Sequence, residues 1–188
     1  MRTLFEPGGF VAARDGTEID PFLNPANTSE GVDGLPGIFS RISAAAGRLR
    51  PGVSSAIHMH PVVSQITYVV SGRLTVKTLR RGQRVPKAFD VQAGAAVVSE
   101  AGVPVQFLND TQEDVAVLYV VSPGYVSDDT YDEAIMLDDW NTSLSDADMA
   151  LARERRAAAL RRRSRSRSRE AESVAQILTR PRTRSAPT

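Results

Sequence analysis

"GVSSAIHMHPVVSQITYVVSG", residues 52–72, contains both histidines of this 188-residue chain, and the two stand one residue apart. On a β-strand, residues i and i+2 point to the same face. His58 and His60 are therefore expected to project together, with Met59 facing the opposite way. The stretch predicts a pair of imidazoles on one face of a strand.

Short strands separated by turn residues are predicted on either side of this stretch. Residues 65–70 and 73–79 are rich in β-branched and aromatic residues, and Ser71–Gly72 between them predicts a hairpin turn. Further strands are predicted at residues 87–92, 95–100, 104–110 and 114–122. Many short strands at this spacing indicate a β-sandwich or small barrel.

Two segments resemble the two sequence motifs of the cupin superfamily, in the right order and 21 residues apart. The first has the spacing of the cupin motif with Gln65 where Glu is usual: Gly52, His58, His60, Gln65, Gly72. In the second, residues 94–109, the matching positions are Gly94, Gly102 and Asn109. There Glu100 replaces a proline and Val105 replaces the last metal-binding histidine. The resemblance covers roughly residues 35–122.

The resemblance implies an all-β fold, a cupin-like double-stranded β-helix or jelly-roll barrel. The residues after Ser145 are strong helix formers and predict a helical, Arg-rich C-terminal extension of that fold. It also implies that His58, His60 and Gln65 hold one divalent transition metal. Imidazoles with an amide oxygen suit Fe, Ni, Mn, Co or Zn. The alternative is that one histidine caps the barrel mouth by hydrogen bonding while the other is half exposed. Val105 cannot ligate, which leaves either an open coordination sphere or a site that binds no metal.

Three further residues are candidates for catalytic roles in the pocket. Gln106 would orient a substrate if a β-bulge near Pro104 turned it inward. Glu100 would act as a general acid or base, and Arg41 would hold a carboxylate or phenolate. The alternative for both Arg41 and Glu100 is an ordinary solvated residue, which the sequence favours.

Charge divides the chain into compositionally different parts. Residues 151–188 contain 12 Arg and 3 Glu, a net charge of +9, whereas residues 1–150 carry −8. The predicted organisation is an N-terminal arm (1–37), a cupin barrel (38–125), an acidic segment (126–148) and a basic helical or disordered tail (149–188). Ser145 is the expected N-cap of the helix.

The expected function is a metal-dependent cupin enzyme that acts on a small, largely apolar metabolite of aromatic or enol type, as an oxygenase. A non-catalytic ligand-binding cupin, or a cyclase or isomerase of the same fold, is the alternative. The expected pocket has an apolar wall formed by six residues: Ile57, Ile66, Val70, Val97, Val105, Phe107.

Partners and location follow from resemblance and composition. By resemblance we expect a homodimer. The Arg/Ser run at residues 161–169 favours self-association or a partner contact, and a nucleic acid is a further option that would also fit a DNA-linked regulator. The chain has no cysteine, which excludes disulfides and thiolate ligands. The absence of a signal-peptide pattern and of a long apolar run predicts a cytoplasmic protein with no membrane contact.

Overall fold

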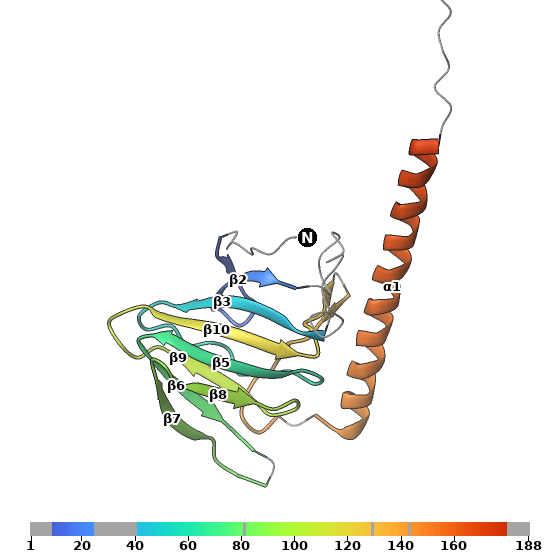
Figure 1. Ribbon diagram of the computed structural model, residues 1–188. Coiled ribbons are helices and arrows are strands. Elements are labelled where there is room, and N and C mark those ends of the chain that lie inside the picture. The colour runs from blue at the N-terminus through green and yellow to red at the C-terminus, as the bar shows by residue number, and fades with distance from the viewer. Residues whose placement is uncertain (1–8, 25–40, 81, 129, 143, 180–188) are drawn as a thin grey trace, which may run out of the picture.

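The computed structural model describes residues 9–24, 41–80, 82–128, 130–142 and 144–179. Two antiparallel sheets face each other, and a single long helix stands beside them (Figure 1). The predicted all-β cupin fold with a helical C-terminal extension is confirmed. Within the described ranges, no helix combines the length and apolarity needed to cross a membrane.

The larger sheet has six strands and the other main sheet has five. The six-stranded sheet runs in the order β1 (Val11–Ala12), β2 (Glu18–Leu23), β3 (Ser43–Leu49), β10 (Val115–Ser122), β5 (Ser64–Ser71), β8 (Ala96–Ser99). The five-stranded sheet runs in the order β13 (Ile135–Met136), β4 (His58–Met59), β9 (Val105–Leu108), β6 (Arg73–Thr78), β7 (Lys87–Gln92). A third, two-stranded sheet pairs β11 (Ser127–Asp128) with β12 (Tyr131–Asp132).

The turn at Ser71–Gly72 carries the chain from one sheet to the other. Strand β5 pairs with β10 and β8, whereas β6 pairs with β7 and β9, so β5 and β6 are not partners. The predicted hairpin at this position is therefore wrong. Gly72 has a φ of 80°, a conformation that glycine adopts readily. The local sequence predicts the turn but does not specify with which strands β6 pairs after it.

Side-chain alternation places the core between the two sheets. Along β5, Gln65, Thr67 and Val69 are buried, while the residues between them are exposed. Ile66 is 45% exposed and Val70 is 56% exposed, so the expectation that they line the pocket is wrong. On β9, Phe107 is buried and lines the cavity between the sheets, as expected of a wall, whereas Val105 is buried outside that lining. Because the outer face of this sheet is also apolar, hydrophobicity alone does not identify its inner face.

Segments outside the cupin motifs complete the sandwich. Within the predicted arm, β1 and β2 extend the six-stranded sheet beside β3. Within the predicted acidic segment, β13 pairs with β4, the strand that carries His58. Segments on both sides of the cupin motifs in the sequence therefore contribute strands to the sheets that contain the histidines.

The helix α1 (Asp146–Thr179) begins with a reciprocal cap. The Ser145 hydroxyl accepts a hydrogen bond from the Asp148 backbone N–H at 3.2 Å, and the Asp148 carboxylate accepts one from the Ser145 backbone N–H at 2.9 Å. This capping box satisfies two backbone donors that would otherwise lack partners. The helix therefore starts where the predicted cap places it.

Candidate metal and ligand site

A cavity of about 300 Å³ lies between the sheets and contains both histidines. Its walls come from β1, β2 and the loop between them, from β3, β4, β5, β9 and β10, and from the segment that follows β10. Most of its lining is apolar, and polar groups come from residues that include His58, His60, Gln65, Tyr119, Tyr125. A concave, mostly apolar pocket with a few convergent polar groups is the usual form of a small-molecule site.

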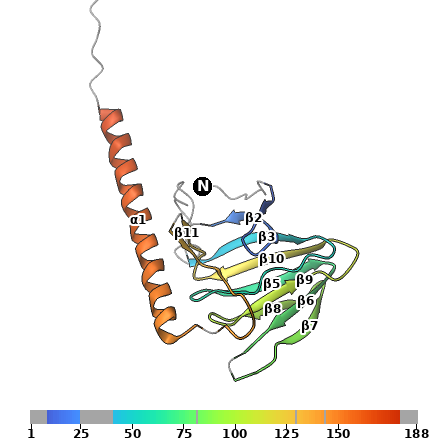
Figure 2. The same cartoon turned by 180° about the vertical axis from the view of Figure 1, so that it is seen from behind.

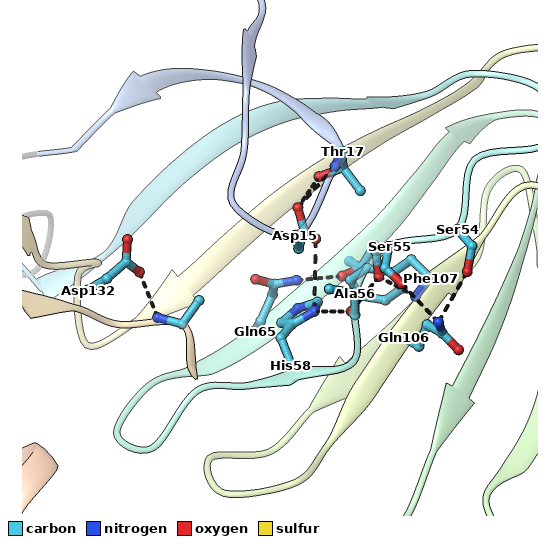
Figure 3. A network of polar contacts seen from close by, with 12 residues as sticks. Asp15, Thr17, Ser54, Ser55, Ala56, His58, Gln65, Gln106, Phe107 and Asp132 are labelled. Carbon is cyan, nitrogen blue, oxygen red and sulfur yellow. Dashed lines mark hydrogen bonds and ion pairs between the residues drawn. The ribbon is translucent and has the colours of Figure 1, made fainter. Parts of the chain in front are cut away.

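His58 is held in one tautomer by the backbone. Its Nδ1 lies 3.0 Å from the Ala56 carbonyl oxygen, to which Nδ1–H donates, and 3.9 Å from the Asp15 carboxylate (Figure 3). Both partners are acceptors, so the proton belongs on Nδ1 and the lone pair on Nε2. Asp15 is itself fixed by hydrogen bonds from Thr17, through its backbone N–H at 3.1 Å and its hydroxyl at 2.8 Å. The N-terminal loop thus supplies a carboxylate behind His58.

His60 is a neutral imidazole at physiological pH. Burial, reinforced by the neighbouring His58, lowers its pKa to about 3, while the backbone carbonyl of Glu133 opposes that shift. The two imidazole rings lie edge to face, with centroids 5.4 Å apart. The Nδ1 atom of His60 is buried and has no hydrogen-bond partner among the described residues. A buried, unsatisfied nitrogen of this kind is a group that a ligand or metal ion would satisfy.

Gln65 offers an amide oxygen to the same cavity. Its Nε2 donates to the Thr67 hydroxyl at 3.1 Å, which orients the side chain. Within the described part of the chain, no group of three or more His, Cys, Asp or Glu side chains is placed to hold a metal ion. The donor set of the three predicted ligands is two imidazoles and one amide oxygen, which fits a divalent transition metal with open positions.

Val105 occupies the place of the missing histidine. It pairs directly with His58 across β4 and β9 and is 1% exposed. Side chains that pair in this way on one face lie about 5 Å apart at their Cβ atoms. A side chain at position 105 is therefore a direct neighbour of the His58 imidazole.

Tyr119 is a site residue that the motifs do not reveal. Burial, with the Asp15 charge, raises the pKa of its phenol, so the hydroxyl stays protonated and can donate. The hydroxyl lies near Thr17 but makes no hydrogen bond of ordinary geometry among the described residues. Gly47 makes room for this ring, because a Cβ there would stand 2.3 Å from Tyr119 Cε2. Strand alternation along β10, where positions 115, 117, 119 and 121 are buried, is the signal that could have found it.

The segment after β10 forms the wall beside His60. The Tyr125 ring packs edge-on against the His60 ring, with the ring centroids 5.9 Å apart. The Tyr125 hydroxyl donates a hydrogen bond to the Asp132 carboxylate at 2.7 Å. Burial raises the pKa of Tyr125, and the Asp132 charge adds to the shift. Asp132 also accepts from the Ala134 backbone N–H at 2.8 Å and lies 3.7 Å from Arg14.

A buried ion pair joins this wall to α1. Glu133 is 0% exposed, and its carboxylate accepts from Arg156 Nε at 2.9 Å and from the Tyr131 hydroxyl at 3.1 Å. The same guanidinium donates to the Gly124 carbonyl at 2.6 Å. Arg156 therefore ties together both ends of the segment that carries Tyr125.

The three residues expected to be catalytic lie outside the cavity lining. Gln106 points away from the interior and donates to the Ser54 hydroxyl at 3.1 Å and the Ser55 carbonyl at 2.9 Å (Figure 3). No bulge interrupts the pairing of β9 with β6, so alternation keeps Gln106 opposite to Val105 and Phe107. Glu100 and Arg41 are exposed. Of the predicted site residues, the structure brings together only His58, His60 and Gln65.

The comparisons with known proteins agree with this fold. Residues 47–121 match the family model described as "Cupin domain", so this part of the chain is a cupin domain. A comparison with curated protein sequences finds no significant match.

Solved structures with similar folds include an oxalate decarboxylase from Lactobacillus farciminis, an oxalate oxidase and the capsular polysaccharide assembling protein CapF from Staphylococcus aureus. The decarboxylase, a formate complex, has a TM-score of 0.52 at 20% identity, covering 72% of this chain and 34% of its own. The oxidase, in complex with glycolate, has a TM-score of 0.51 at 19% identity, and the match covers 70% of this chain and 59% of the oxidase. CapF has a TM-score of 0.54 at 14% identity, and the match covers 73% of this chain and 33% of CapF. These identities establish the fold alone, and this chain spans about a third of the decarboxylase and of CapF and 59% of the oxidase.

Proposed function

We propose that this protein is a metal-dependent cupin enzyme, an oxygenase that acts on a small aromatic or enol-type metabolite. The observation that supports it most is the convergence of His58, His60 and Gln65 on one apolar cavity of about 300 Å³. In this proposal the three side chains hold a divalent transition metal. When bound, such an ion would polarise substrate oxygen atoms as a Lewis acid and supply a centre for oxygen chemistry.

The remaining pocket residues bind and orient the substrate. Phe107 and Tyr119 offer aromatic surface on which a planar apolar body would pack, with the histidines at one end. The protonated Tyr119 hydroxyl is a donor for a substrate oxygen. A volume of about 300 Å³ is at the small end of ligand pockets, which favours a single-ring compound.

A second candidate, a cupin that binds a small molecule without catalysis, is favoured by one observation. Val105 fills the position of the last motif histidine with a buried apolar side chain. A site with fewer ligands retains the pocket and loses affinity for a metal. The homodimer, the cytoplasmic location and the cyclase or isomerase alternative stay predictions.

Oxygen uptake by the metal-loaded protein with a panel of catechols and enolic ketones separates these candidates. We expect turnover above that of the metal-free protein for at least one compound, and its loss in Gln65→Ala. Gln106→Ala is the matched control, because that amide faces away from the cavity, and it should retain activity. Ligand binding without turnover for every metal and compound would refute the oxygenase and support the binding protein.

A further inference from the structure

The sequence of α1 is dense in arginine. Between residues 153 and 169 the sequence has nine Arg and one Glu. Over the same span an α-helix rises about 25 Å. This concentration of positive charge on one element contrasts with the net charge of −8 on residues 1–150.

One stripe of the helix fixes it to the barrel. Ala152 and Ala159 are buried, and Arg156, at the intermediate helical turn, pairs with the buried Glu133. Arg163, one turn further, donates to the Ser127 carbonyl. Positions 152, 156, 159 and 163 recur at the three- and four-residue spacing of one helix face. Arg162, beside this stripe, donates to the Thr130 hydroxyl. Up to residue 165, the face of the helix opposite the stripe is turned away from the barrel.

Arginines occupy the surface that this docking leaves open. Four of them are exposed and make no ion pair within the described ranges: Arg153, Arg155, Arg161, Arg165. At 100° per residue, Arg161 points away from the docking stripe and Arg153 and Arg155 flank it on opposite sides. Figures 1 and 2, from opposite directions, show α1 standing beside the sandwich and continuing past it. The cationic surface is thus accessible from more than one side.

We propose that α1 is an arm that binds double-stranded DNA through its phosphates, without sequence preference. Guanidinium groups bind phosphate oxygens with bidentate geometry. A helix about 10–12 Å across fits a major groove about 12 Å wide, whose two phosphate-lined edges suit arginines on several sides of the helix. This proposal is independent of the chemistry in the cavity.

The composition of α1 favours a duplex over the other polyanions. The helix contains no Phe, Tyr or Trp, so it lacks the aromatic platforms that stack single-stranded bases. An acidic protein partner would use apolar anchors at the centre of the interface. The exposed large apolar residues of α1 are two, Leu151 and Leu160, within the part whose side chains the structure describes.

Fluorescence anisotropy of a short labelled DNA duplex, titrated with the full chain at several salt concentrations, tests this arm. We expect binding that weakens steeply with salt, since each neutralised phosphate adds about 0.9 to the slope of log K against log salt. Replacing the four exposed arginines by Gln should lower that slope by about 3 to 4 and weaken binding at least tenfold at low salt. The substitutions are Arg153→Gln, Arg155→Gln, Arg161→Gln and Arg165→Gln.

The matched control removes the same number of cations from the barrel: Arg50→Gln, Arg80→Gln, Arg84→Gln and Lys87→Gln. It should bind the duplex within about twofold of the unchanged protein, and far-UV circular dichroism should show that α1 persists in both variants. An equal loss in the control, or no salt-sensitive binding at all, would overturn the proposal. Tighter binding to poly-glutamate than to DNA would instead assign the arm to an acidic protein partner.

Discussion

Replacing Arg156 by Met is expected to destabilise the fold by about 3 to 5 kcal/mol, the usual cost of leaving one member of a buried ion pair without its partner. Glu133 is 0% exposed and Arg156 is 13% exposed, so water compensates little for the lost charge. Removing both charges in Glu133→Gln/Arg156→Met should recover most of the loss. Denaturant unfolding of the two single variants and the double variant measures the coupling.

Arg153→Met is the control for the loss of a helix arginine as such. Arg153 is exposed, so its replacement should change the free energy of unfolding by no more than about 0.5 kcal/mol. A double variant as unstable as Arg156→Met would show that the pair is not what holds α1 on the barrel.

The loss of stability in Arg156→Met should also depend on pH. Burial raises the pKa of Glu133 above its ordinary value of 4.5, and the Arg156 charge opposes that shift. Because the folded state then holds the proton more tightly than the unfolded state, stability falls as pH rises through the interval between the two pKa values. Without Arg156 the pKa of Glu133 in the folded state rises further. The loss in the free energy of unfolding caused by Arg156→Met should therefore be largest near pH 7 and shrink on acidification towards pH 5. A deficit that stays constant over this range would contradict this role for Glu133.

Val105→His should increase the affinity for a divalent transition metal at least tenfold, about 1.4 kcal/mol. Position 105 pairs with His58 across two adjacent strands and faces the buried interior, so the new imidazole would join the two already present. A third imidazole converts the donor set to one of the common catalytic types. Competition with a chromophoric chelator for Co or Zn measures the change.

Val117→His is the comparison variant, because position 117 is equally buried but lies on β10, in the opposite sheet. It should not gain affinity. Unchanged affinity in a folded Val105→His protein would contradict the placement of the metal beside His58.

The motif spacing predicted the histidine side of the cavity, because strand alternation is a local rule. It places His58, His60 and Gln65 in one interior without knowledge of the rest of the fold. The same rule, applied from Gln65, turns Ile66 and Val70 outward. Assigning these two residues to the pocket from their hydrophobicity alone placed them on the wrong face of the strand.

The other side of the cavity depends on contacts distant in sequence. Asp15 reaches His58 only because the N-terminal loop is held by its own backbone bond to Ala56, at 2.7 Å. Tyr125 reaches His60 because Arg156, some 30 residues later, fixes the segment that carries it. The sheet switch at Gly72 is likewise a choice of partner strand. No periodicity in the sequence encodes these pairings.

The metal content of the protein, purified without chelator and measured by plasma mass spectrometry, tests the central claim most directly. Near-stoichiometric transition metal is expected in the unchanged protein and in Gln106→Ala, and its loss is expected in a folded His58→Ala variant. Absence of metal from all three proteins, even after reconstitution with Fe, Mn, Ni and Zn, would contradict the metal centre and leave a binding cupin.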